Sequence, residues 1–304
     1  MRIIVNGQQA FGKAVLERLL SEKYDVVAVY CAPDAQGGRT DPLKKFAIES
    51  GITVYQPESY KEASVLDQIV SLQSDLCVMA YVTLMIPESI LNAPTLGTIQ
   101  YHPSLLPKHR GPSAINWPII FGESVTGLSI FWPDEGIDTG PILMQKQCAI
   151  GSDDTLGSLY FDKLFPMGVS AMVEAVDLVR KGEAPSIAQP AENVSYEGWC
   201  GLNDAFIDWS RSADQLHDLI RGCDPQPGAW TTLNGKRMQL FGSSKVESVL
   251  GPPGSVISSK KDLVVSTGDG GIRVQKVRLE REPKVTSEEF ISDVGAIDDI
   301  QLGS

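Results

Sequence analysis

Two stretches of the sequence carry side chains that can transfer protons. His102 ends an apolar run and begins the stretch H-P-S-L-L-P-K-H-R-G-P-S-A-I-N-W. The stretch D-E-G-I-D-T-G follows at residues 134–140 and places Asp138 close to two glycines. Imidazole and carboxylate groups are common general acids and bases. Together the two stretches predict a reaction centre in which His102 and Asp138 polarise a carbonyl group and assist proton movement in acyl transfer.

The other two histidines are expected to lie outside this chemistry. His109 stands between Lys108 and Arg110, so we expect a solvated loop residue. His217 falls on the polar side of an expected helix. No H-x-H or H-x-x-x-H pair occurs among the three histidines of the chain. Because zinc sites commonly draw ligands from such short spacings, we expect no metal in the site.

The residues before position 150 predict the α/β fold that must position these groups. Short apolar runs alternate with helical patterns, which predicts a mainly parallel, Rossmann-like sheet with helices on both faces. The expected strands are 2–5, 25–30, 52–55, 76–80, 98–102 and 127–132, and the expected helices are 14–20, 43–50 and 65–72. Ligands of such sheets lie beyond the carboxyl ends of the strands. Since His102 ends one strand and Asp138 follows another, we expect both at one edge of the sheet.

A second unit is predicted beyond residue 200. Residues 153–181 read as one long helical stretch that a turn at 182–185 ends, and a linker-like stretch follows at 190–198. An amphipathic helix at 212–221 then precedes short strands with Gly and Pro turns, a pattern typical of a small OB-like β-barrel. We therefore expect a catalytic domain over 1–200, a barrel domain over 204–285 and an acidic, partly disordered tail over 286–304.

Composition narrows the class of protein. The chain has 304 residues, 42% of them hydrophobic, a net charge of −12 and a pI of about 4.8, which argues against general attraction to nucleic acid. Its five cysteines form no C-x-x-C pair, as expected in a reducing compartment. The first residues already form a strand, so we expect no signal peptide. No apolar run is long enough to span a membrane, and we expect a cytoplasmic protein without a membrane partner.

The first loop resembles a dinucleotide loop only superficially. Residues 6–12 read N-G-Q-Q-A-F-G, which lacks the G-x-G-x-x-G spacing, and no acidic residue follows at the end of the expected strand 25–30. An acidic residue at that place would bind the ribose of a nicotinamide cofactor. We therefore expect no NAD(P) site here.

Beyond these patterns, the sequence resembles the formyltransferase family that uses 10-formyltetrahydrofolate. The resemblance rests on H-P-S-L-L-P from His102, on Arg110-Gly111 and on D-E-G-I-D-T-G from Asp134. It continues into the second unit with I-D-W at 207–209 and P-G-A-W at 227–230. The branch that the sequence resembles most is the N-terminal hydrolase domain of 10-formyltetrahydrofolate dehydrogenase. The sequence is also similar to methionyl-tRNA formyltransferase.

The resemblance implies roles for named residues. His102 matches the acid of the family and Asp138 its essential aspartate. It further implies that the folate, as 10-formyltetrahydrofolate, is bound by Leu84, Met85, Ile86, Ser104, Leu105, Asp134, Gly136 and Asp138. Gln100 departs from the pattern, because most formyltransferases have Asn there and the hydrolase branch has an apolar residue. An amide one methylene longer than Asn can still donate to the formyl oxygen or hold a water, so we count Gln100 as a third catalytic candidate.

Three activities remain open at this point. Hydrolysis would release formate and tetrahydrofolate, and we expect no NADP-dependent oxidation of the formyl group by this chain alone. Formyl transfer to an amine, on methionyl-tRNA or an amino-sugar nucleotide, is the alternative. A tRNA partner requires a basic surface. Residues 204–281 carry eleven Lys or Arg against nine Asp or Glu, which gives this alternative little support unless Arg221, Lys236 and Arg237 cluster on one face. The third possibility is a folate-binding protein without catalytic activity, although such a protein has no need of both His102 and Asp138.

Overall fold

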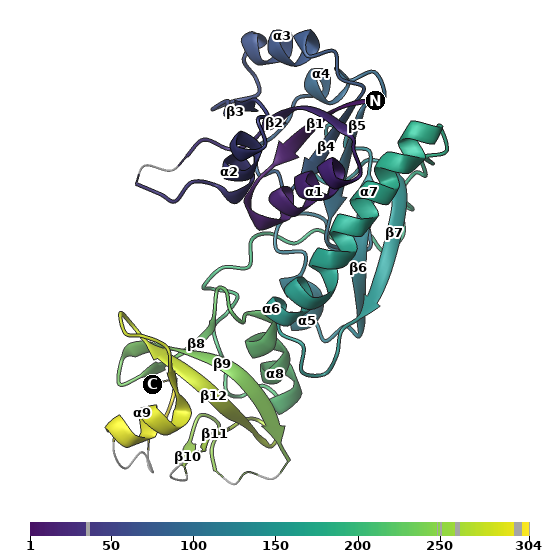
Figure 1. Cartoon of the computed structure of the whole chain (residues 1–304). Helices are drawn as coiled ribbons and strands as arrows, with labels where there is room; N and C mark the ends of the chain where they lie inside the picture. Colours follow the sequence, from purple (N-terminus) through teal and green to yellow (C-terminus); the bar gives the residue numbers. More distant parts are fainter. Residues whose placement is uncertain (35–36, 248, 250, 259–261, 295–299, 304) are drawn as a thin grey trace. The chain divides into compact units, whose positions relative to one another are not determined.

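The computed structural model describes residues 1–34, 37–247, 249, 251–258, 262–294 and 300–303, and these form two compact units (Figure 1). The first unit comprises Met1–Gly111, Gly127–Cys148 and Lys163–Tyr196. The second comprises the described residues of Pro112–Thr126, Ala149–Asp162 and Glu197–Ser304. Among the described residues, every helix is too short or too polar to cross a membrane.

The first unit contains the predicted mainly parallel sheet. Its strands lie in the order β3-β2-β1-β4-β5-β6-β7, and β1 to β5 run parallel to one another. The central strand β4 is buried along its whole length, whereas the edge strand β7 alternates after its first residues because one face is solvated. The bounds are β1 (Arg2–Gly7), β2 (Asp25–Tyr30), β3 (Val54–Tyr55), β4 (Leu76–Ala80), β5 (Thr98–His102), β6 (Val125–Phe131) and β7 (Ile142–Ala149).

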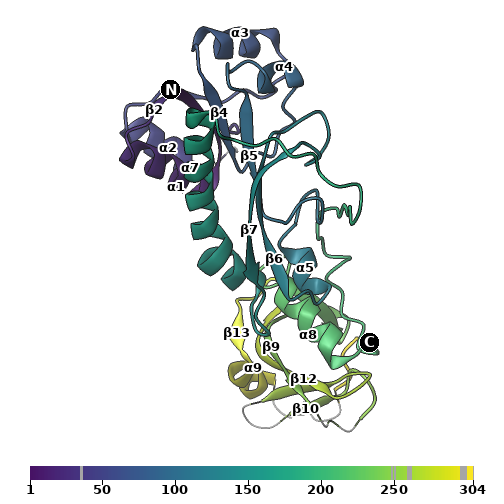
Figure 2. The same cartoon turned by 90° about the vertical axis from the view of Figure 1, so that its right-hand side faces the viewer.

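Helices cover both faces of this sheet (Figures 1 and 2). Helices α1 (Gln9–Ser21), α2 (Pro42–Glu49) and α7 (Phe165–Lys181) pack on one face, and α3 (Ala63–Ser71) and α4 (Glu88–Leu91) on the other. Successive strand residues alternate between the two cores, as Ile3 and Ile4 of β1 do. The alternation fixes which strand side chains face each layer.

The direction of β6 differs from the expectation. Its Ser129 pairs with His102 in antiparallel register, so β6 runs opposite to β5. β6 and β7 form a hairpin, with the Trp132 amide donating to the Pro141 carbonyl over 2.9 Å. His102 ends the parallel strand β5 as expected, but Asp138 does not follow a parallel strand. They meet because the loop between β6 and β7 folds back beside the end of β5.

The start of α1 shows what the N-terminal glycines do. A Cβ on Gly7 would lie 2.2 Å from the Ala80 carbonyl oxygen, so this glycine permits close packing of backbone on β4. Both carboxylate oxygens of Asp41 accept from the Gln9 amide, at 2.8 and 3.1 Å, and one also accepts from the Leu43 amide. Asp41 thus occupies the place where a phosphate would bind in a dinucleotide loop.

The predicted long helix over 153–181 is interrupted. A short helix α6 (Leu156–Ser158) begins at a capping box on Thr155, and a π-helical stretch (Leu159–Leu164) separates it from α7. Pro166 lies in the first turn of α7 and has no N–H to donate to the carbonyl four residues earlier, so the regular ladder is broken there. The predicted end at Gly182 is confirmed, with φ of 71° in the left-handed region.

The second unit is a curled antiparallel half-barrel with helices packed against it (Figure 1). Its strands follow the order β10-β11-β12-β9-β8, with β13 beside β12. A core of Leu, Ile and Val side chains joins the sheet to α8, which begins at the Ser212 capping box. The bounds are α5 (Asn116–Ile120), α8 (Ala213–Gly222), β8 (Ala229–Leu233), β9 (Lys236–Val246), β10 (Val256–Ser258), β11 (Leu263–Ser266), β12 (Gly271–Leu279), β13 (Val285–Thr286) and α9 (Ser287–Val294).

Two expectations for this unit need correction. The stretch set apart as an acidic, partly disordered tail forms α9, whose Phe290 and Ile291 belong to the core of the half-barrel; residues 295–299 and 304 lie outside the described residues. His217 is buried rather than solvated on a polar helix face. Its Nδ1 lies 2.8 Å from Ser243 Oγ and its Nε2 lies 2.9 Å from the Ser152 carbonyl oxygen, so it joins α8 to two other segments.

Cys200 is expected to be alkylated faster than the buried thiols. The Cys223 thiol donates to the Cys200 sulfur, which lowers the pKa of Cys200, whereas burial raises the pKa of Cys31 to about 11 and that of Cys77 to about 12. A lower pKa leaves more thiolate, the reactive form, at pH 7–8. Iodoacetamide labelling followed by peptide mass spectrometry measures the rates. Cys223→Ala should slow the labelling of Cys200, and Cys77→Ala should leave it unchanged; equal rates in all three proteins would contradict the assignment.

Candidate active site

His102 is presented at the last position of β5. Ile99 and Tyr101 point into the core beneath α1 and α7, where Tyr101 lies 4.3 Å from Phe11 between ring centroids. Because side chains alternate along a strand, Gln100 and His102 face the opposite side. The His102 side chain is buried, with 6% of its surface exposed. β5 therefore fixes both the depth and the direction of the imidazole.

The hydrogen bonds of His102 determine which nitrogen is available for chemistry. Nε2 lies 2.8 Å from the carbonyl oxygen of His109. A carbonyl only accepts, so Nε2 must carry a hydrogen and donate. The second nitrogen, Nδ1, lies 3.5 Å from Asp138 Oδ2. A proton on Nδ1 makes this contact favourable, and Nδ1 is therefore the position from which His102 can give and take a proton.

Asp138, the partner of His102 in this contact, is held in place by a backbone amide. The residue is 9% exposed and has φ of 55°, in the left-handed region that few non-glycine residues adopt. The Gly111 amide donates to Asp138 Oδ2 over 2.8 Å, the oxygen that faces His102. One carboxylate oxygen thus contacts both a backbone amide and the imidazole. The pair places an imidazole nitrogen and a carboxylate oxygen 3.5 Å apart, where both can act on one bound group.

His109 contributes through its backbone. The prediction that His109 is a solvated loop residue is wrong, because its side chain is only 5% exposed. Its φ of 53° lies in the left-handed region. Its carbonyl accepts from His102, and its amide donates to Ser195 Oγ over 2.8 Å. The flanking charges Lys108 and Arg110 suggested solvent, but the contacts that bury His109 come from residues distant in sequence.

Gln100 lies on the same face of β5 as His102 and is partly exposed. Its backbone pairs with Met79 of β4 and Phe131 of β6, and its side chain makes no hydrogen bond to another described residue. An amide beside the His102–Asp138 pair with unused donors and acceptors can bind a carbonyl oxygen or a water.

The segment 84–86 follows β4 at the edge where β5 also ends. Leu84 and Ile86 are partly buried against the core under α4, whereas Met85 between them is 63% exposed. Met79 at the end of β4 pairs with Gln100, which brings this segment to the carboxyl end of β5. An exposed apolar side chain at a sheet edge is available to a flat ring such as a pterin.

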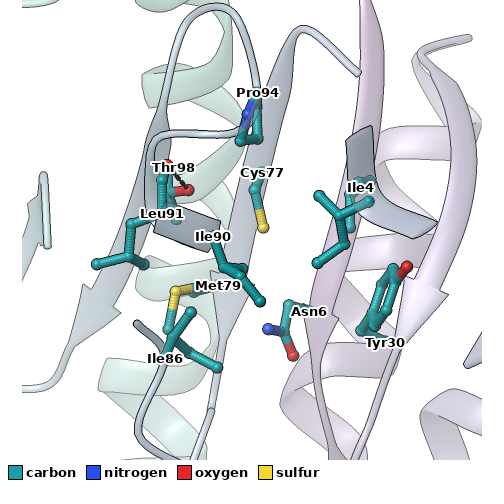
Figure 3. A pocket seen from close by; sticks show the side chains of 11 residues that line it. Ile4, Asn6, Tyr30, Cys77, Met79, Ile86, Ile90, Leu91, Pro94 and Thr98 are labelled. Carbon is teal, nitrogen blue, oxygen red and sulfur yellow. Dashed lines mark hydrogen bonds between the residues drawn. The ribbon is translucent and has the colours of Figure 1, made fainter. Parts of the chain in front are cut away.

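The cavity beneath this segment is distinct from the site. It has a volume of about 10 Å³ and lies between the sheet and α4, with Ile86 at one end beside Met79 and Asn6 (Figure 3). A volume of that size holds about one water molecule and no substrate. The cavity is therefore part of the packing under Ile86.

The remaining folate-binding candidates have shaping roles in this structure. Ser104 is fully buried, and its hydroxyl donates to the Lys108 carbonyl over 2.7 Å, so its side chain does not face a ligand. Leu105 packs over Gly127 of β6. Asp134 is exposed and accepts from the Thr139 hydroxyl and the Gly136 amide within its own loop. A Cβ on Gly136 would lie 2.0 Å from Thr139 Oγ1, which explains the glycine.

Sequence reasoning missed two residues beside the pair. Ser195 lies in the predicted linker 190–198 and Gln189 directly before it, yet Gln189 binds the Asp138 loop and Ser195 binds the His109 loop. No local pattern marks them, since their partners lie 49 to 86 residues away. Within the described part of the chain, no three His, Cys, Asp or Glu side chains come together as metal ligands.

Comparison with known proteins identifies both units. Residues 1–176 match the family described as formyl transferase, and residues 202–294 match the formyl transferase C-terminal domain. Human mitochondrial 10-formyltetrahydrofolate dehydrogenase is 38% identical over 96% of this chain, which spans 33% of that protein. Cytosolic 10-formyltetrahydrofolate dehydrogenases are also similar. The chain thus spans about a third of the length of the dehydrogenases it matches.

Two further comparisons extend over nearly the whole chain. A methionyl-tRNA formyltransferase from Caldanaerobacter subterraneus is 36% identical over 96% of both proteins. The crystal structure of HypX from Aquifex aeolicus in complex with tetrahydrofolic acid superposes with a TM-score of 0.69 and 19% identity, covering 96% of this chain and 47% of that one. At 19% identity, the similarity to HypX shows a shared fold.

Proposed function

Because the chain belongs to the formyl transferase family, we propose that it is an enzyme that removes the formyl group of 10-formyltetrahydrofolate and passes it to water. The observation that supports this most directly is the contact of 3.5 Å between His102 Nδ1 and Asp138 Oδ2 beside the unused amide of Gln100. An acid, a base and an amide donor at one sheet edge are the groups that hydrolysis of a formamide requires.

The proposed reaction begins with the folate against Met85 and the 133–138 loop. Asp138 orients a water and takes its proton as the oxygen attacks the formyl carbon. The developing oxyanion is stabilised by His102 and by the Gln100 amide. As the carbon–nitrogen bond breaks, the proton passes through the pair to N10. The products, formate and tetrahydrofolate, balance the consumed water.

Formyl transfer to methionyl-tRNA is the second candidate, supported by the similarity to a methionyl-tRNA formyltransferase over 96% of both proteins. The structure weakens one argument for it. Arg221 is 6% exposed and engaged with Asp218 and with the carbonyls of Gly151 and Asp154, so it cannot join Lys236 and Arg237 in a basic surface. An amino-sugar nucleotide is the other amine acceptor consistent with the family.

The assay that tests this function follows tetrahydrofolate release from 10-formyltetrahydrofolate with and without methionyl-tRNA. Release that needs no acceptor is expected. Strict dependence on tRNA would show the second candidate to be right, and binding without release under any condition would show a folate-binding protein. We further propose residues 1–200 as the catalytic domain, the predicted C-terminal domain of 204–285 extended to include α9, and the cytoplasm as the site of action.

A further inference from the structure

The side chain of Gln189 links the two loops of the site. Its Nε2 donates to the carbonyl oxygens of Asp138 and Gly140, both at 2.8 Å. Its Oε1 accepts from Arg110 Nε at 3.1 Å and from Arg110 Nη2 at 2.7 Å. Both donor hydrogens and both lone pairs of the amide are therefore used. A surface linker residue would not be expected to satisfy all four.

These bonds close a ring around the aspartate. Arg110 is followed by Gly111, whose amide donates to the Asp138 carboxylate, and Gln189 binds Arg110 and the Asp138 carbonyl. Asp138 is thus held by its side chain and its backbone at once. Its φ of 55° lies in the left-handed region, which is uncommon for non-glycine residues although aspartate adopts it more readily than most, and these hydrogen bonds hold the backbone there. The Gln189 amide contributes by donating to the carbonyl oxygen of Asp138.

The same segment reaches His102. Its beginning is anchored by two backbone hydrogen bonds between Ile187 and Ile142 of β7, at 2.7 and 2.9 Å. Farther along, Ser195 Oγ accepts from the His109 amide and the Ser195 carbonyl accepts from the Arg110 amide. The His109 carbonyl is the acceptor that fixes Nε2 of His102. One short stretch, 187–195, therefore contacts the supports of both proton-transferring groups.

From these contacts we propose that Gln189 is a positioning residue of the reaction, which sets the orientation of Asp138 toward His102 Nδ1 from outside the substrate site. This inference rests on the proposed function for its kinetic consequence. The half of the amide that matters is its N–H₂ group, because that group binds the two carbonyls of the Asp138 turn. The hydrogen bonds from Arg110 to Oε1 fix the other end of the Gln189 amide.

Two substitutions separate positioning from general stabilisation. Gln189→Glu keeps the shape and an oxygen for Arg110 but removes both donors and turns an anionic oxygen toward two carbonyls. Gln189→Met keeps the length and removes every hydrogen bond. We expect kcat to fall about tenfold or more in both, with KM for the folate changed by less than about threefold. Full activity in Gln189→Glu would overturn the proposal, since only the Arg110 contact would then be needed.

A matched control is Gln56, whose Nε2 donates to the Ala32 carbonyl over 2.7 Å near the edge strand β3. Gln56→Met should leave kcat and KM unchanged. Thermal unfolding of all three variants shows whether they are folded at the assay temperature. If Gln189→Met is unfolded there, the result for Gln189→Glu decides.

Side-chain NMR of His102 tests the positioning without turnover. With ¹⁵N-labelled protein and His102→Asn to assign the signals, we expect the Nδ1 resonance of His102 to shift in Gln189→Glu and not in Gln56→Met. An unshifted resonance in Gln189→Glu would overturn the positioning role whatever the kinetics. A shifted resonance in a protein whose wild type releases no tetrahydrofolate would instead leave the positioning standing and remove the proposed function.

Discussion

Replacing Asp138 by Asn is expected to lower kcat for tetrahydrofolate release by about 10³-fold while changing KM much less. Asn has the same shape, and its oxygen can still accept from the Gly111 amide, so the turn should persist. The amide cannot take a proton from water. It also presents either an N–H donor or a neutral oxygen to His102 Nδ1, so the negative charge facing the imidazole is lost.

His102→Asn should cause a loss of similar size, because the two groups act as one unit. For the same reason the double variant should be little worse than either single variant. Asp67→Asn, on the exposed face of α3, is the matched control and should behave as wild type. Circular dichroism and the unfolding midpoint establish that the folds are retained. A kcat for Asp138→Asn within threefold of wild type would remove the assigned role of the carboxylate.

Gly140→Ala is expected to destabilise the first unit by roughly 3 kcal/mol or more and to abolish turnover. A Cβ on Gly140 would lie 1.8 Å from the Trp132 carbonyl oxygen. That oxygen is backbone at the closing end of the β6–β7 hairpin, where the Trp132 amide donates to Pro141, so it cannot move without opening the hairpin. Gly140 also supplies one of the carbonyls that Gln189 binds, and Asp138 lies two residues away.

Urea unfolding with wild-type and variant protein measures the free energy of unfolding. Gly198→Ala is a suitable comparison, because no heavy atom lies within 4 Å of the added Cβ and the glycine has no positive φ. That variant should differ from wild type by no more than about 0.5 kcal/mol. Stability and activity close to wild type in Gly140→Ala would show that the hairpin is far more pliable than its contacts indicate.

The parallel part of the sheet was predictable because its signal is local. β1 and β4 are continuous apolar runs, as strands covered on both faces must be, and His102 stands directly after such a run. The hairpin of β6 and β7 also had a signal. The connection from Phe131 to Ile142 is too short for the helical crossover that a parallel neighbour requires.

Other features depend on contacts that no short pattern displays. His109 and His217 are buried by partners 26 to 86 residues away, so their polar neighbours in sequence were misleading. Gln189 stands next to Pro190 in a stretch with the composition of a linker. In the C-terminal stretch, acidic residues concealed the pair Phe290 and Ile291, whose apolar side chains complete the core.

The carboxylate of Asp41 has a consequence for how ligands approach the first unit. By accepting from the amides at the starts of α1 and α2, it neutralises the partial positive charge at the α1 N-terminus and adds a full negative charge in front of it. An anionic ligand arriving there meets repulsion instead of attraction. The Asp41 carboxylate thus lies at the start of α1, directly after β1, and the strand order reverses between β1 and β4.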